Sequence, residues 1–236
     1  NTVYVSPPTQ PRVNVPWLGG DNADDQAAPL FFLRRALTDT PRIGVQVVAR
    51  APAASITVEE IKAAQIVFVT EALPPATLNV LREQALAGKT VVFVPKTAEA
   101  GATLGGLLGN PAVRVDEARP SNYAMFAEID FQHPLFAPFA DPRYSDFTKI
   151  HFWRYRKIDP ATIAGARVIA KFDSGDPALL EAPLGQGRLV VLASGWQPAD
   201  SQLSVSTKFV PLLWSLLEFT GGVNTAPTPG FVGDNV

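Results

Sequence analysis

The sequence contains no cysteine, only one methionine and only two histidines among its 236 residues. The absence of cysteine excludes disulfide bonds, thiolate metal sites and a thiol nucleophile. It does not fix the compartment, because a chain of this length can bury a core that needs no disulfide, in cytosol as well as in an envelope space. No apolar run approaches the roughly 20 residues that cross a bilayer, and we expect no signal peptide. We therefore expect no membrane contact by this segment. Because it begins with Asn1, we expect a processed product or an excised piece.

Charge is also scarce, at 18% of residues, and the formal net charge is −2. A polyanionic partner needs clustered Lys and Arg, so this balance predicts no nucleic-acid binding. The densest basic segment, 149–157, is interleaved with Phe152, Trp153 and Tyr155, which is typical of a strand with one solvated face. With 47% hydrophobic residues, the chain is expected to fold as a single domain over 1–222, followed by a flexible tail or linker over 223–236.

The first half alternates apolar runs with helical patterns. Strands are predicted over 2–5, 43–49, 65–69 and 90–94, and a Pro- and Gly-rich loop over 6–23. Helices are predicted from Asp24 to Leu37, after the capping box of Thr57 and Glu60, from Pro74 to Gly88, and within 97–112. Apolar strands that alternate with helices predict a doubly wound, mostly parallel α/β sheet.

The second half changes character. Residues 116–144 are aromatic and Pro-rich, and we expect them to wrap the sheet edge as loop with Phe126, Phe131, Phe136 and Phe139 buried. Gly185-Gln186-Gly187 predicts a tight hairpin between strands 179–184 and 188–193, so the sheet should gain an antiparallel region. Val210, Leu213, Trp214 and Leu217 predict a final amphipathic helix that docks on the sheet.

Two blocks carry a family resemblance. They are "IDFQHPLFAPFADPRYSDFTKIHFWRYR" and "FDSGDPALLEAPLGQGRLVVLASGWQPADSQLSVSTKFVPLLWSLLEF". Together with the order of elements, they resemble the class I glutamine amidotransferase-like domain of bacterial membrane-anchored proteins similar to the Bat-type aerotolerance proteins. In those proteins a membrane anchor and a von Willebrand A-like domain precede such a domain. The resemblance implies a flavodoxin-like fold with any site at the carboxyl ends of the strands.

A working amidotransferase of that family needs a Cys on a strand-to-helix elbow, activated by a His-Glu pair. After strand 91–94 this chain has Pro95-Lys96-Thr97 instead, so no catalytic residue is carried over. The remaining candidates for a strand-end crevice are Lys96, Ser194, Trp196, His133 and His151. Ser194 lacks the G-x-S-x-G pattern of a nucleophile elbow and is more simply a strand-ending hydroxyl. We expect the aromatic segment to fill the crevice largely.

Neither a metal nor a cofactor is predicted. Asp21, Asp24 and Asp25 lack the ligand spacing of a calcium loop and are explained by helix capping. The two histidines form no zinc motif, and "GLLGN" is not a dinucleotide fingerprint. Arg154, Arg156 and Lys157 could hold an anion, although a solvated strand face explains them more simply.

Three functions stay open. The leading hypothesis is a non-catalytic module for protein interaction or ligand sensing within a larger membrane-anchored envelope protein. Its partners would be other domains of the same polypeptide or envelope proteins. The domain would lie on the periplasmic or extracytoplasmic side, although the sequence is also compatible with a cytoplasmic location. The second is a hydrolase or sugar-processing enzyme using Ser194 with His133 or His151. The third is a carbohydrate-binding module that stacks sugars on Trp17 or Trp196.

Overall fold

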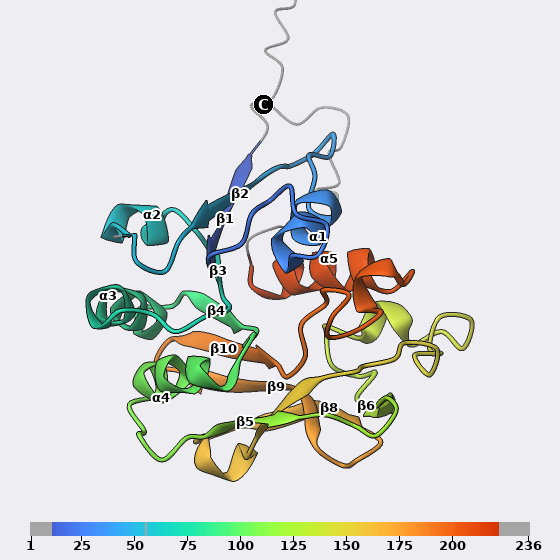
Figure 1. Cartoon of the computed structure of the whole chain (residues 1–236). Coiled ribbons are helices and arrows are strands. Elements are labelled where there is room, and N and C mark those ends of the chain that lie inside the picture. The colour runs from blue at the N-terminus through green and yellow to red at the C-terminus, as the bar shows by residue number, and fades with distance from the viewer. Residues whose placement is uncertain (1–10, 55, 222–236) are drawn as a thin grey trace, which may run out of the picture.

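The computed structural model describes residues 11–54 and 56–221. At its centre lies an eight-stranded sheet with the order β2-β1-β3-β4-β10-β9-β8-β6 (Figure 1). Neighbouring strands run parallel from β2 to β10 and antiparallel from β10 to β6. These strands are β1 (Arg12–Leu18), β2 (Gly44–Arg50), β3 (Ile66–Val69), β4 (Thr90–Phe93), β6 (Phe126–Ile129), β8 (Arg167–Phe172), β9 (Pro177–Leu184) and β10 (Gly187–Leu192). A separate two-stranded sheet pairs β5 (Val115–Ala118) with β7 (Tyr155–Ile158). The predicted mixed α/β class, with a large mostly parallel sheet and an antiparallel hairpin, is confirmed.

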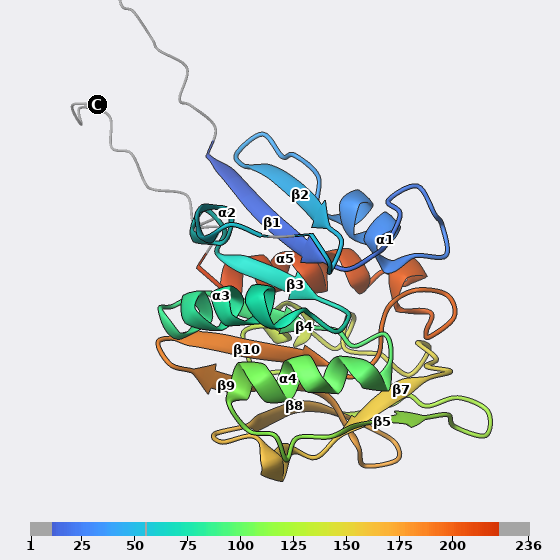
Figure 2. The same cartoon turned by 60° about the vertical axis from the view of Figure 1, so that its left-hand side comes forward.

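Helices cover both faces of the sheet, as Figures 1 and 2 show from two directions. On one face α1 (Pro29–Ala36) and α5 (Phe209–Phe219) pack over a core that includes Trp17, Phe68 and Trp196. On the other face α2 (Val58–Lys62), α3 (Pro75–Leu86) and α4 (Gly101–Leu108) cover a second core. Strands such as β3 and β4 are buried along their whole length because they lie between these layers.

β1 contradicts the loop predicted over 6–23. The run Arg12–Leu18 contains Pro16, and proline is normally a signal against a central strand because it cannot donate to a ladder. Here β1 forms a continuous ladder with β3 only at Trp17 and Leu18, and one isolated bridge joins Asn14 to Ala64, so Pro16 lies in the interruption between the two. The strand predicted over 2–5 and the tail predicted over 223–236 lie outside the described residues.

Three other local predictions can be compared with the structure. The Thr57–Glu60 capping box is present in full. The helix predicted from Asp24 begins only at Pro29, because Asn22 and Asp25 accept from the backbone N–H groups of Asp24 and Ala27 and hold turns there. In α5, Leu213 and Leu217 are buried as predicted, but Val210 is 46% exposed because it lies in the first turn, beyond the face that packs on the sheet.

The aromatic segment is only partly a loop. It contains β6 and most of β5, which the sequence did not predict because neither strand shows a clear alternation. Phe126, Phe136 and Phe139 are buried as predicted, and Phe131 is partly buried. They join the core on the α5 face of the sheet. Within the described residues, no helix combines the length and apolarity required of a membrane span.

Candidate functional site

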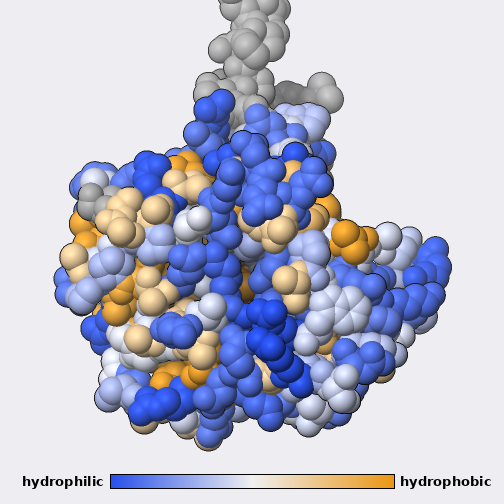
Figure 3. Space-filling view, viewed as in Figure 1, coloured by the Kyte–Doolittle hydropathy of each residue, from blue (hydrophilic) through white to orange (hydrophobic). Residues whose placement is uncertain are grey.

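Side chains that follow the parallel strands meet at one edge of the sheet. Asp21 follows β1, Glu71 follows β3, Lys96 follows β4 and Ser194 follows β10. The carboxyl ends of parallel strands are where open α/β folds place their binding sites, because the loops converge there. The middle of the face seen in Figure 3 is mostly hydrophilic. This edge is therefore the candidate site.

Lys96 is held by two carboxylates. Its Nζ lies 2.9 Å from Asp21 Oδ1 and also forms an ion pair with Glu71 Oε1. Both acids are themselves fixed, since Trp17 Nε1 donates to Asp21 Oδ2 at 2.9 Å and the Gly20 N–H donates to Glu71 Oε1 at 3.1 Å. Burial acts to lower the pKa of Lys96, but the hydrogen bonds of Glu71 and Asp21 outweigh it, so the pKa is raised. Lys96 is therefore a cation, and a poor nucleophile.

Arg156 forms a second, deeper network. The sequence favoured a solvated position for this residue, and that prediction is wrong, because Arg156 is fully buried. Its guanidinium donates to Asp200 Oδ2, to the carbonyl of Lys96 and, over 3.2 Å, to Glu117 Oε1. The three acceptors explain how a full positive charge is retained in the interior.

Asp200 completes this network from the loop after β10. It is fully buried, and burial raises its pKa against the lowering influence of Arg156. Its Oδ1 has no hydrogen-bond partner among the described residues and lies 3.7 Å from Arg154 Nε. The Asp200 carbonyl accepts from the backbone N–H groups of Trp153 and Arg154, which fastens this loop to the segment before β7.

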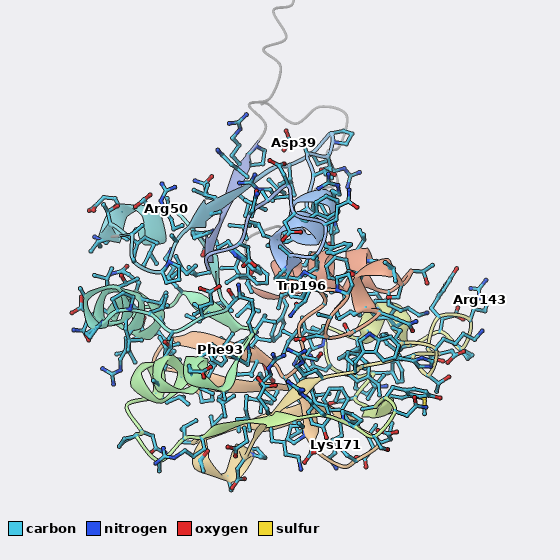
Figure 4. The ribbon with its side chains drawn as sticks, in the orientation of Figure 1. Asp39, Arg50, Phe93, Arg143, Lys171 and Trp196 are labelled. Carbon is cyan, nitrogen blue, oxygen red and sulfur yellow. The ribbon has the colours of Figure 1, made fainter. Side chains whose placement is uncertain are left out.

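Ser194 and Trp196 serve the structure of the same loop. The Ser194 hydroxyl donates to the Arg154 carbonyl at 2.8 Å, so it continues the fastening of the two segments. Trp196 has no exposed surface, and its indole N–H donates to the Pro29 carbonyl at 2.7 Å. It lies inside the molecule near α1 and α5 (Figure 4). Trp17 is equally buried, 5.9 Å from Trp196 between ring centroids, so neither indole presents a face for sugar stacking.

The histidines do not join the edge. His133 Nε2 lies 3.1 Å from Glu181 Oε1 in the middle of β9, and its Nδ1 accepts from the Leu135 N–H at 3.2 Å. That second bond requires an unprotonated Nδ1, so the geometry assigns the proton to Nε2. His151 stacks on Tyr123 with 3.8 Å between ring centroids. In the described structure no hydrogen bond connects Ser194 with either histidine.

The backbone at the edge has no nucleophile elbow. Such an elbow is a strained strand-to-helix turn that exposes its nucleophile above the sheet. Among residues 11–54 and 56–221, every positive φ belongs to a glycine, so Lys96 and Ser194 lie in ordinary backbone conformations. As a result, the chain positions charged groups at this edge but does not present an activated hydroxyl or amine.

Of the five candidates that the sequence suggested, the structure brings Lys96 and Ser194 into the edge network and keeps Trp196, His133 and His151 out of it. The sequence interpretation missed Glu71 and Asp200, attributed Asp21 to capping and placed Arg156 in solvent. A usable signal was present for Glu71, which follows the predicted strand 65–69 by two residues, but not for Asp21, because the strand before it was predicted as loop. Arg156 and Asp200 gave no such signal, since their partners are distant in sequence.

No protein family and no curated protein matches the sequence. Solved structures do match its fold. A cytoplasmic protein from Salmonella typhimurium is 15% identical with a TM-score of 0.64, over 87% of this chain and 98% of that one. A ThuA-like protein from Bacteroides uniformis is 9% identical with a TM-score of 0.61, over 93% and 95%. A candidate GMP synthase component from Thermoplasma acidophilum is 9% identical with a TM-score of 0.52, over 89% and 98%. Identities this low establish only that this chain shares the fold of these solved proteins.

Proposed function

We propose that this chain is a flavodoxin-like, class I glutamine amidotransferase-like domain without a nucleophile, which serves as a non-catalytic module for protein interaction or ligand sensing. The observation that carries the proposal is the ion pairing of Lys96. It stands after β4, where the resemblance would put the catalytic cysteine, and two carboxylates neutralise it. The site position is thus occupied by an ion pair that ties β1, β3 and β4 together.

The other groups at the edge support the same conclusion. Ser194 uses its proton in a hydrogen bond to a backbone carbonyl, and within residues 11–54 and 56–221 no general base forms a hydrogen bond with it. Arg156 and Asp200 neutralise each other in the interior. A hydrolase would need a hydroxyl, a base and an orienting group within hydrogen-bond reach of one another. This arrangement favours a rigid recognition surface over a reaction centre.

The cellular setting of the proposal rests on the resemblance to domains of Bat-type proteins. We propose that the module belongs to a membrane-anchored envelope protein and contacts other domains of that polypeptide or envelope proteins. Protease accessibility of the tagged, full-length gene product in intact cells and in spheroplasts tests this setting. Digestion only after the outer barrier is opened is expected, whereas protection in intact spheroplasts would place the domain in the cytoplasm.

Catalysis is tested with the purified protein. Ammonia release from L-glutamine should equal that of a heat-denatured sample, and a fluorophosphonate probe should leave Ser194 unlabelled, because its hydroxyl lacks a base. Ser194→Ala is the matched control for the probe. Labelling that disappears in Ser194→Ala, or ammonia release above the denatured control, would replace this proposal with an enzyme.

A further inference from the structure

β2 is an edge strand with an open outer side. Its Gly44 N–H donates to the Pro11 carbonyl, and its Arg50 carbonyl accepts from the Gly19 N–H, so these residues face β1. Backbone groups alternate along a strand, so Val45, Val47 and Ala49 direct theirs away from the sheet. No further strand lies beyond β2 in the described sheet. Unpaired edges of this kind are templates for another strand.

The two ends of this edge carry opposite charges. At the start of β2, Asp39 Oδ1 accepts from the Val45 N–H at 2.8 Å. At the end, the Arg50 guanidinium donates to the Ala49 carbonyl at 3.3 Å and also forms an ion pair with Glu60 Oε1 at 2.5 Å. Figure 4 shows Asp39 and Arg50 at opposite ends of β2. Between these two capped groups remain the Val45 carbonyl, both groups of Val47 and the Ala49 N–H.

We propose that β2 pairs with β2 of a second copy of this chain, antiparallel and centred on Val47. In that register each Val47 exchanges two backbone hydrogen bonds with its counterpart. Each Ala49 N–H donates to the Val45 carbonyl of the second copy. The pairing uses the four kinds of group left uncapped. It also places Arg50 opposite Gly44 of the second copy, and Asp39 lies beside Gly44.

Charge complementarity selects this occupant. A two-fold axis presents the same surface from both copies, so an edge must be complementary to itself when reversed. Reversal brings Asp39 of each copy to Arg50 of the other, which makes two opposite-charge contacts. A strand from an unrelated protein would meet that pattern only by carrying the same two charges at the same spacing.

The side chains fit the same register. Val45, Val47 and Ala49 are partly buried on the α1 face, and pairing opposes Val45 with Ala49 and Val47 with Val47. On the other face a hollow of about 480 Å³ lies beside the edge, with Val48 and Ile56 in its lining. Gln46 and Val48 of the second copy fall over this hollow. Small apolar cross-strand pairs of this kind stabilise antiparallel ladders.

A charge-swap experiment tests the proposal by sedimentation velocity over a concentration series. Wild type should associate to a dimer, and both Asp39→Lys and Arg50→Glu should weaken association about tenfold or more, because each converts two attractive contacts to repulsive ones. An equimolar mixture of the two variants should dimerise again, since the mixed pair restores opposite charges at both ends. Asp24→Lys changes the same charge at an exposed position outside the edge and should dimerise as wild type does.

A second variant tests the proposal independently if the charge variants fail to fold. Ala49→Pro removes an outward N–H while leaving the ladder to β1 intact, and proline is tolerated on strand edges. It should stay folded by circular dichroism and be monomeric. Wild type that remains monomeric at every concentration would overturn the proposal and leave the edge to a strand of another protein. Failure of the mixture to associate when wild type does would equally overturn the proposed register.

Discussion

Arg156 and Asp200 form an ion pair in which the two side chains are only 1% and 0% exposed. Arg156 lies on β7 and Asp200 follows β10, so the pair connects the small sheet to the loop at the carboxyl edge of the large one. Such a pair contributes little net stability relative to apolar residues, but its two charges depend on each other. Removing Asp200 leaves the buried Arg156 charge with only Glu117 and the Lys96 carbonyl as acceptors.

Asp200→Ala should therefore lower the free energy of unfolding by about 3–5 kcal/mol, the range for removing one partner of a buried ion pair. Guanidinium denaturation followed by circular dichroism measures the change. Arg143→Ala is the matched control, because Arg143 pairs with Asp141 while 76% exposed. It should cost less than about 1 kcal/mol. Equal losses in the two variants would mean that the Arg156 charge is solvated in the folded protein.

Most of the sheet could be predicted from sequence because its strands have clear local patterns. β3 and β4 are short apolar runs between turn signals, and the hairpin of β9 and β10 is marked by Gly185, which adopts a φ of 63°. β1 could not be predicted, since Pro16 looks like a loop residue unless the start of the β3 ladder is known. Local pattern does not contain that information.

The candidate site was less predictable than the fold. Lys96 and Ser194 follow recognisable strands, so their places at the edge could be expected. Arg156 lies in a run of aromatic and basic residues that is typical of a half-solvated strand, and its burial depends on Asp200, 44 residues later. The two buried tryptophans show the same limit, because a strand-end Trp can either line a cleft or seal a core.

Trp196 should be a structural residue and not a sugar platform. Trp196→Phe loses the hydrogen bond to the Pro29 carbonyl and some volume, so it should destabilise by about 1–3 kcal/mol, whereas Trp196→Ala should cost about 3–5 kcal/mol. Thermal unfolding ranks the stabilities of the two variants. A glycan array probed with folded Trp196→Phe should show the same signals as wild type. A selective loss of one glycan would instead revive a carbohydrate-binding role.

Lys96→Met should destabilise the edge through the two carboxylates it leaves behind. Asp21 and Glu71 would then face each other without a cation, at a cost of about 1–3 kcal/mol for a partly buried group. Because the pKa of Lys96 is raised in the folded state, its contribution is present below the ordinary value of 10.5 and is lost as pH rises through the folded value.

The pH profile separates this explanation from a simple packing defect. The difference in unfolding free energy between wild type and Lys96→Met should be largest below the ordinary Lys value of 10.5 and shrink as pH rises through the raised pKa of Lys96, where its charge is lost. Urea denaturation at a series of pH values gives this difference. A cost independent of pH would show that the aliphatic part of Lys96, and not its charge, stabilises the edge.

Glu60 gives a pH effect of the opposite sign at the start of α2. The Thr57 N–H, together with the Arg50 guanidinium, lowers the pKa of Glu60 below its ordinary value of 4.5. Its contribution to stability is therefore present above about pH 4.5 and is lost as pH falls through the lowered value.

Glu60→Gln keeps an acceptor for Thr57 but removes the charge, so it should cost about 1 kcal/mol at neutral pH. Glu59→Gln, one residue earlier and exposed, is the matched control for the helix dipole and should cost only a few tenths of a kcal/mol. Denaturation curves of the two variants should converge with wild type at acid pH. If Glu60→Gln kept its full deficit there, the amide would be failing as a cap and the charge would not be responsible.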